Sequence, residues 1–333
     1  MLVGNSVINI PVHTHIRFIS IPVNKRLSLS RLLAGIRHMR VYLKLKPSLL
    51  IIGTHELLWP SLLLRLFTRT KIIYDVRENY YLNIRHSSAF PLPVRLLIAL
   101  YVRAKEIITA PFVTHFTLAE FVYSQQLPFI NERFTVIENK SARNSVRSNR
   151  KLTEPVKIIF TGTIAESTGI YEAIDFVIGL QKNNLNVNFT IIGFTALYRD
   201  LLRIKNKIAE FDFIQLVGGN QRVPHDQIIA AIKAADFGII HYPESSHTLD
   251  RIPTKYFEYL SHQLPFFMDS TSSLFAEAIA YPACIGVDFR NPEYAQTITK
   301  IKEIKFYQML PKATTWDSEE EKLLQLLRQL AAV

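Results

Sequence analysis

Short apolar runs alternate with amphipathic segments along almost the whole chain. Runs such as 48–53, 71–76 and 156–161 are rich in Ile, Leu, Val and Phe, a composition typical of strands buried on both faces. The segments between the runs repeat apolar residues at helical spacing. This alternation predicts an α/β protein with parallel sheets and helices packed on their faces.

The same pattern gives approximate bounds for each element. We expect strands near 15–22, 48–53, 71–76, 112–118, 133–138, 156–161, 187–192, 213–217, 236–240, 264–268 and 283–287. We expect helices near 28–45, 56–68, 91–109, 168–182, 196–210, 225–235, 253–262, 271–280, 292–302 and 317–330.

A polar, basic stretch interrupts this pattern near the middle of the chain. Residues 141–155 contain few apolar residues, so we expect an interdomain linker there; the alternative is a basic run that binds phosphate. A chain of 333 residues suits two domains of roughly 150 residues each. We therefore expect domains at 1–140 and 156–333.

A charged segment late in the chain predicts an anion site. Asp250 and Glu258 stand eight residues apart, and Pro253 is well placed for the first position of a helix. Arg251 and Lys255 put positive charge at the positive end of that helix, where the dipole disfavours it unless an anion is bound. This arrangement indicates a nucleoside-diphosphate pocket; the alternative is a surface helix with scattered charges.

Polar residues and glycines follow the predicted strands. Ligands of open parallel sheets bind beyond the carboxyl ends of the strands, and glycine allows a ligand to approach the backbone closely. The alternative is that loops are polar in any case. The residues that follow the strands include Gly53, His55, Glu56, Arg77, Glu78, Gly162, Thr163, Gly193, Gly218, His241 and Tyr242.

The positive charge is concentrated in one half of the chain. Residues 1–150 hold 21 Lys and Arg against 7 Asp and Glu, whereas residues 151–333 hold 18 against 21. The basic half predicts an anionic membrane surface or an acidic acceptor as partner, and the alternative is charge that only confers solubility. We expect no nucleic-acid partner, because no recognised motif or zinc spacing is present.

The remaining features bear on location. The single cysteine, Cys284, cannot form an internal disulfide, which fits a reducing compartment. We expect no secretory leader and no membrane span, and therefore a soluble chain or one that lies on a membrane surface. Helix 91–109, with Arg95, Arg103 and Lys105, predicts either a membrane-surface helix or a core helix with a basic rim.

Four stretches together resemble one protein family, the group 1 (family 4) nucleotide-sugar glycosyltransferases of the GT-B fold. The most specific is Pro253-Thr-Lys-Tyr-Phe-Glu-Tyr-Leu260 followed by Leu264-Pro265. The others are Lys71-Ile-Ile-Tyr-Asp-Val-Arg-Glu78, Val136-Ile-Glu-Asn139, and Ile158-Ile-Phe-Thr-Gly-Thr163 with Gly169-Ile170.

The resemblance implies two facing Rossmann-like domains, the first binding the acceptor and the second the nucleotide-sugar donor. It implies retention of anomeric configuration without a metal or cofactor. Glu258 would bind the ribose hydroxyls, Asp250 would contact the donor sugar, and Lys255 would contact the diphosphate. The expected catalytic residues are Asp250, Arg251 and Lys255. The further donor-side residues are Gly162, Thr163, Thr168, Gly193, Tyr242 and Thr254. The expected acceptor-side residues are His55, Glu56, Arg77 and Glu78, although Glu56 has the alternative role of opening a helix.

The chain departs from the family pattern at several positions. Thr163 and Thr168 stand where the family usually has an Arg and a Lys that grip the diphosphate, Arg77 replaces a frequent histidine, and Asp250 replaces glutamate. The first strand and helix of the N-terminal domain are expected to be missing. Three functions therefore stay open.

The first is a transferase that acts on a lipid-linked or polysaccharide acceptor in the cytoplasm or at the inner face of the membrane. The second is a GT-B binding or assembly subunit with impaired catalysis. The third is another GT-B enzyme, such as an epimerase.

Overall fold

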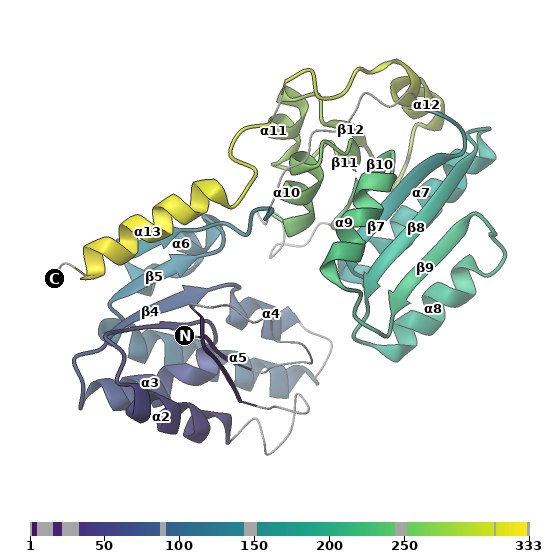
Figure 1. The fold of residues 1–333 in the computed structure, drawn as a ribbon. Helices are drawn as coiled ribbons and strands as arrows, with labels where there is room; N and C mark the ends of the chain where they lie inside the picture. Colours follow the sequence, from purple (N-terminus) through teal and green to yellow (C-terminus); the bar gives the residue numbers. More distant parts are fainter. Residues whose placement is uncertain are drawn as a thin grey trace. The chain divides into compact units, whose positions relative to one another are not determined.

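The structure, a computed structural model, describes residues 2–4, 16–21, 33–86, 91–142, 152–243, 252–309 and 311–331. The chain divides into two compact units (Figure 1). Unit 1 comprises Met1–Glu138 and Lys322–Val333, and unit 2 comprises Asn139–Glu321. Both are α/β structures with parallel sheets, which confirms the expected fold class.

Unit 1 is built on a four-stranded parallel sheet in the order β3-β4-β5-β6. Its strands are β3 (Leu49–Ile52), β4 (Lys71–Val76), β5 (His115–Leu118) and β6 (Phe134–Val136). Each strand pairs with the next one along the chain, and right-handed crossovers then put the connecting helices on one face. Figure 1 shows α2 (Ala34–Leu45), α3 (Leu58–Arg65) and α5 (Leu92–Thr109) as one layer on that face.

Shorter elements complete unit 1. They are the helices α4 (Tyr80–His86) and α6 (Val122–Gln126) and the 3-10 turns η1 (His55–Leu57), η2 (Ala110–Phe112) and η3 (Pro128–Ile130). The sequence pattern predicted neither α4 nor α6, because five to seven residues are too few for a helical repeat to stand out.

The described N-terminal residues form a separate pair of strands. β1 (Leu2–Gly4) pairs in parallel with β2 (Phe18–Ser20). The latter matches the strand expected near 15–22, and α2 occupies the described part of the helix expected at 28–45. The expected loss of a preceding strand and helix stays a prediction.

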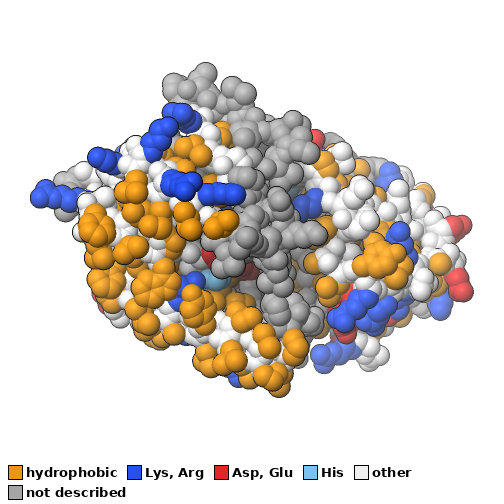
Figure 2. Space-filling view, turned by 90° about the horizontal axis from the view of Figure 1, so that it is seen from below, with side chains coloured by type: hydrophobic (Ala, Val, Ile, Leu, Met, Phe, Trp, Pro, Cys, Tyr) orange, Lys and Arg blue, Asp and Glu red, His pale blue; other side chains and the backbone are white. Residues whose placement is uncertain are grey.

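Helix α5 buries its charges and exposes apolar residues. Lys105 and Glu106 are buried in unit 1, whereas the outward side of the layer carries many hydrophobic side chains (Figure 2). The expected core helix with a basic rim is therefore wrong for Lys105, since this lysine lies on the inward face. Nowhere in the described chain is a helix long and apolar enough to cross a membrane.

Unit 2 contains a six-stranded parallel sheet in the order β12-β11-β10-β7-β8-β9. Its strands are β7 (Val156–Thr163), β8 (Val187–Phe194), β9 (Ile214–Gly219), β10 (Phe237–Ile240), β11 (Phe266–Asp269) and β12 (Cys284–Val287). The chain proceeds outward from β7 to β9 and then restarts beside β7 with β10. The strand order therefore reverses between β7 and β10, and ligands of such sheets bind at that point.

Helices cover both faces of this sheet (Figure 1). They are α7 (Ile170–Lys182), α8 (Tyr198–Ile208), α9 (His225–Ala234), α10 (Thr254–Ser261), α11 (Phe275–Ala280) and α12 (Tyr294–Glu303), with the turn η4 (Glu166–Thr168) before α7. Phe176 of α7 packs edge-on against Phe267 of β11 and Phe289. Tyr256 of α10 packs against Phe266 on the opposite face. Phe266 and Phe267, at successive positions of β11, thus help to hold α10 and α7 on opposite faces of the sheet.

The last helix, α13 (Asp317–Ala331), starts among the residues of unit 2 and ends among those of unit 1. Its C-terminal end accepts a hydrogen bond in unit 1, from Lys71 Nζ to the carbonyl oxygen of Leu330 (2.5 Å). The expected second domain, 156–333, differs from unit 2 here because it included this end.

The N-terminal end of α13 is tied to the start of unit 2 by a buried ion pair. Lys140 Nζ lies 2.7 Å from Glu319 Oε1, and both side chains are buried. A bridge between Ser141 and Thr315 lies beside the pair. Removing one partner of such a pair leaves an uncompensated buried charge.

We therefore predict that Glu319→Gln lowers the free energy of unfolding by roughly 3 kcal/mol. Urea-induced unfolding followed by circular dichroism measures this change. The matched control is Glu320→Gln, which alters the exposed neighbouring carboxylate and should change stability little. Equal stability of the two variants would contradict the assigned role of the pair.

Candidate functional site

The strand reversal in unit 2 gathers polar side chains at one edge of the sheet. β7 ends at Thr163, and β10 ends directly before His241. Tyr259 of α10 shares a buried hydrogen bond with Thr161 of β7 (Oη to Oγ1, 3.0 Å). This bond fixes α10 against the carboxyl end of β7, so the start of α10 lies at the reversal point.

Lys255, in the first turn of α10, is the most unusual residue at this edge. Its side chain is 6% exposed, and its ammonium has no hydrogen-bond partner among the described residues. The nitrogen instead lies 4.0 Å from the ring centre of Phe160 and 5.1 Å from that of Tyr242. Two aromatic faces attract a cation but do not replace hydrogen bonds, so this ammonium is available to an anion.

Burial sets the protonation of this lysine. Desolvation lowers the pKa of Lys255 to about 7, and the nearby carboxylate of Glu258 opposes the shift. A bound anion would favour the charged form and raise the pKa again. Charge on Lys255 and anion binding are therefore coupled.

Glu258 lies one turn further along α10. It is buried, and desolvation raises the pKa of its carboxyl group, an effect that His225 and Lys255 oppose. His225 Nε2 at the start of α9 lies 3.7 Å from Glu258 Oε1. Because the Glu258 carboxylate accepts no hydrogen bond from any described residue, it can accept bonds from the hydroxyl groups of a ligand.

Several other residues of this segment were expected at the start of the helix or in the site. Asp250 and Arg251 lie outside the described residues. Pro253 is the N-cap of α10 rather than its first helical residue, and Thr254 takes the first helical position with its side chain exposed. The helix therefore begins one residue later than expected, because the backbone of Pro253 is extended and not helical.

Three of the predicted glycines lie in register at the ends of adjacent strands. Gly162 pairs with Gly193, and Gly193 pairs with Gly218. They belong to the strands instead of following them. A Cβ on Gly193 would lie 1.8 Å from the carbonyl oxygen of Gly162, and one on Gly218 would lie 2.4 Å from that of Gly193. Packing between strands thus suffices to explain these two glycines.

Gly162 is different. Its φ is +99°, and a Cβ built there meets no described atom within 4 Å. The backbone of β7 therefore borders open space at this one of the three positions, as expected for close approach of a ligand.

Thr168 has a local structural role. Its hydroxyl lies 2.8 Å from the carbonyl oxygens of Thr163 and Ala165 and accepts a hydrogen bond from the Ala165 N–H (3.2 Å). The threonine closes the turn before α7 and so uses its hydroxyl on the backbone. Thr163 is exposed, and neither residue supplies the positive charge that the family usually has there.

A histidine–aspartate pair, in which the histidine is buried, lies beside this turn. His241 Nδ1 is 2.5 Å from Asp269 Oδ2, and the imidazole ring stacks on Phe289 with centres 4.4 Å apart. A Cβ on Gly169, the N-cap of α7, would lie 2.3 Å from His241 Cδ2. The Cγ–Cδ2 edge of the imidazole ring therefore faces the start of α7.

Sequence analysis missed Asp269 because 28 residues separate it from His241. Only the pairing of β10 with β11 brings the two together.

The expected acceptor-side residues lie in unit 1, at the carboxyl ends of β3 and β4. The guanidinium of Arg77 lies where a Cβ on Gly53 would approach it to 3.0 Å, and it donates a hydrogen bond to Asp75 (Nε to Oδ2, 2.8 Å). Tyr80 donates to the carbonyl oxygen of Gly53 (3.3 Å) and packs edge-on against His55. The structure thus brings His55 and Arg77 to one edge of the sheet.

The two expected acids, Glu56 and Glu78, each interact with a neighbouring side chain of unit 1. Glu56 lies in η1, where His55 Nε2 is 3.9 Å from its carboxylate, and Glu78 accepts a hydrogen bond from Asn83 of α4. The position of Glu56 agrees with its alternative role at the start of a helix.

Buried charges of α5 adjoin this edge and were not predicted from the sequence. Lys105 Nζ donates to His55 Nδ1 (2.8 Å), and Tyr74 donates to Glu106 Oε1 (3.0 Å). Burial lowers the pKa of Lys105 and raises that of Glu106. Their apolar neighbours along the helix concealed them, because charged residues in such a segment ordinarily face solvent.

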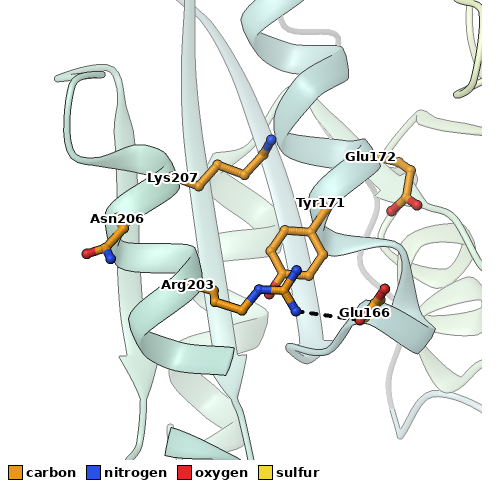
Figure 3. A pocket seen from close by; sticks show the side chains of 6 residues that line it. All are labelled: Glu166, Tyr171, Glu172, Arg203, Asn206 and Lys207. Carbon is orange, nitrogen blue, oxygen red and sulfur yellow. Dashed lines mark ion pairs between the residues drawn. The ribbon is translucent and has the colours of Figure 1, made fainter. Parts of the chain in front are cut away.

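A separate surface pocket of about 490 Å³ lies between η4, α7 and α8 (Figure 3). Its lining is polar, with Arg203 directed at Glu166 and lying over the ring of Tyr171. The pocket shares no lining residue with the Lys255 site. No group of three or more His, Cys, Asp or Glu that could hold a metal ion occurs in the described ranges.

Comparisons with solved structures confirm the GT-B fold. Sucrose-phosphate synthase from Thermosynechococcus elongatus matches with a TM-score of 0.72 and 13% identity, over 97% of this chain and 85% of that chain. Anabaena HepE, solved with UDP and glucose, matches at 0.64 and 11% over 94% and 86%. A glycosyltransferase from Rickettsia africae matches at 0.64 and 14% over 95% and 85%.

Comparisons by sequence give a different result. No protein-family model and no curated protein matches the chain. The solved structures are only 11–14% identical to this chain, so their similarity to it establishes the shared fold alone.

Burial of the Lys255 ammonium should make the free energy of unfolding depend on pH. The pKa of Lys255 is about 7 in the folded protein, below its ordinary value of 10.5. The unfolded chain therefore binds more protons between these values, and the free energy of unfolding should rise as pH rises through this range. Lys255→Met should remove this dependence and stabilise the free protein below pH 7 by roughly 1 kcal/mol or more.

Urea unfolding at about pH 6 and about pH 9 tests this linkage. The control Lys302→Met changes an exposed lysine of α12 and should leave the pH dependence as it is. A Lys255→Met variant less stable than the wild type at both pH values would show that the ammonium stabilises the fold.

Proposed function

We propose that the protein is a retaining glycosyltransferase that moves a sugar from a nucleoside-diphosphate sugar to an acceptor. The observation that carries this proposal is the buried ammonium of Lys255, without a hydrogen-bond partner among the described residues, at the strand reversal of a GT-B fold. A diphosphate would supply the missing partner. Solved structures with this fold include one in complex with UDP and glucose and one in complex with UDP and GlcNAc, so UDP is the first nucleotide to test.

The proposed catalytic effect is electrostatic. Cleavage of the bond between sugar and diphosphate places negative charge on the leaving group, and a cation fixed in a water-poor site stabilises that charge most effectively. Lys255 and the N-terminus of α10 would provide this stabilisation. Asp250 and Arg251, which lie outside the described residues, would complete the catalytic set at the donor sugar. No metal or cofactor is required in this scheme.

The remaining proposed donor contacts come from residues near Lys255 in unit 2. Glu258, one turn from Lys255, would accept hydrogen bonds from the ribose hydroxyls. Gly162 would allow the donor to approach the end of β7, with Thr163, Thr168, Gly193, Tyr242 and Thr254 as further neighbours. His241, held by Asp269 beside the start of α7, would be a further neighbour of the donor.

The acceptor is proposed to be a saccharide or a lipid-linked saccharide bound by unit 1. His55, Glu56, Arg77 and Glu78 would contact it through hydrogen bonds, and the buried Lys105 would orient His55. A cytoplasmic site of action, at or near the inner face of the membrane, fits this substrate class.

One observation favours a second candidate, a GT-B subunit that binds nucleotide but does not transfer sugar. Two cations of the family pattern are absent, and the Thr168 hydroxyl is committed to backbone atoms. Charged hydrogen bonds contribute roughly 1.5–3 kcal/mol each, so their loss could preserve binding while slowing catalysis.

Calorimetric titration with UDP, GDP and ADP tests the proposal. We expect one nucleotide to bind and Glu258→Ala to weaken it at least tenfold, about 1.4 kcal/mol. Glu303→Ala, at the exposed end of α12, is the control and should bind normally.

Failure of a folded sample to bind any of the three nucleotides would overturn the donor-site proposal. Binding without release of sugar from any donor, with acceptors supplied, would favour the second candidate.

A further inference from the structure

The exposed side of α5 is apolar along most of its length. Leu97, Leu100, Ala104 and Ile108 recur at spacings of three and four residues and form one exposed stripe. Leu97 alone is 69% exposed. The opposite side of the helix buries Lys105 and other charges, so the usual amphipathic arrangement of a surface helix is reversed here.

The neighbouring helix α3 extends this stripe. Trp59 and Leu63 are exposed on α3, and Phe67, just after its C-terminal end, is 80% exposed. Figure 2 shows the hydrophobic side chains spread across the outward side of the layer, with Lys and Arg side chains beside them. We call the exposed residues Trp59, Leu63, Phe67, Leu97, Leu100 and Ile108 the apolar face.

The charges beside the apolar face are of one sign. α2, α3 and α5 contain a single acid, Glu106, and it is buried. On α2, the basic residues Arg40 and Lys44 are exposed on the same side as Leu43, and Arg69 is exposed after Phe67. Soluble monomers rarely expose large contiguous apolar patches, so a face of this kind marks an interaction site.

We propose that the apolar face docks unit 1 onto an anionic lipid bilayer. Apolar side chains that enter the boundary between headgroups and acyl chains, with basic side chains beside them, are the features of interfacial helices. Arg40, Lys44 and Arg69 would pair with anionic headgroups, each adding attraction that falls with salt. The exposed side carries no acid on these helices that would oppose the contact.

A second copy of the chain fits this surface less well. Symmetric pairing through the apolar face would bring two sets of basic side chains together with no acids of α2, α3 or α5 to neutralise them. A bilayer satisfies both the apolar and the basic part of the surface. The proposal concerns lipid alone and does not depend on nucleotide binding in unit 2.

Vesicle sedimentation of the full chain, without nucleotide, tests the proposal. We expect the wild type to bind vesicles of phosphatidylcholine mixed with phosphatidylglycerol, and to bind phosphatidylcholine vesicles at least about tenfold more weakly. The variant Phe67→Asp with Leu97→Asp should lose at least about tenfold in partition to the mixed vesicles, because it removes two inserted side chains and adds negative charge.

The matched control changes two exposed apolar residues of unit 2. Tyr198→Asp with Leu202→Asp alters α8, where Tyr198 is also 69% exposed, and should bind vesicles like the wild type. Because all four residues are exposed, circular dichroism and the urea midpoint should be unchanged in both variants.

Three results would overturn the proposal. They are absence of wild-type binding to mixed vesicles, equal binding by the Phe67→Asp, Leu97→Asp variant, and a wild-type dimer that this variant abolishes without any lipid binding. None of them bears on nucleotide binding, so the donor-site proposal stands or falls separately.

Discussion

The cost of burying the ammonium of Lys255 is the constraint on which the site depends. An amine with its nitrogen over two aromatic rings, and with no hydrogen-bond partner among the described residues, weakens the free fold. Such a residue is expected at a functional position, where strain or desolvation serves binding. The strand reversal, the α10 helix and the Thr161–Tyr259 bond together hold the nitrogen where an anion can reach it.

The two units place their polar groups by the same principle with different outcomes. In unit 2 the reversal between β7 and β10 brings Lys255, Glu258 and the His241–Asp269 pair to one edge of the sheet. In unit 1 the strands follow one another in order, and the buried charges of α5 reach the carboxyl edge through His55. The inward turn of these charges leaves the outer face of α5 apolar, so the polar edge and the apolar face are two results of one helix orientation.

Much of the fold could be predicted from hydrophobic periodicity, because strands buried on both faces and long amphipathic helices leave clear patterns. The helix at 254–261 lies within the range expected near 253–262. Gly162, Gly193 and Gly218 lie at the carboxyl ends of strands, although within the strands and not after them. The orientation of α5 could not be predicted, since Lys105 and Glu106 are charged yet buried, and pattern arguments place charge outside. The His241–Asp269 pair depends on strand order, which spacing along the chain does not reveal.

The coupling between charge on Lys255 and anion binding can be measured directly. At about pH 8 the free amine, with a pKa of about 7, is mostly neutral, whereas a bound diphosphate would raise that pKa and protonate it. Titrating UDP, or whichever nucleotide binds, in two buffers of different ionisation enthalpy counts the protons taken up. The account predicts uptake approaching one proton by the wild type and none by Lys255→Met. Binding without proton uptake by the wild type, or equal uptake by both proteins, would contradict it.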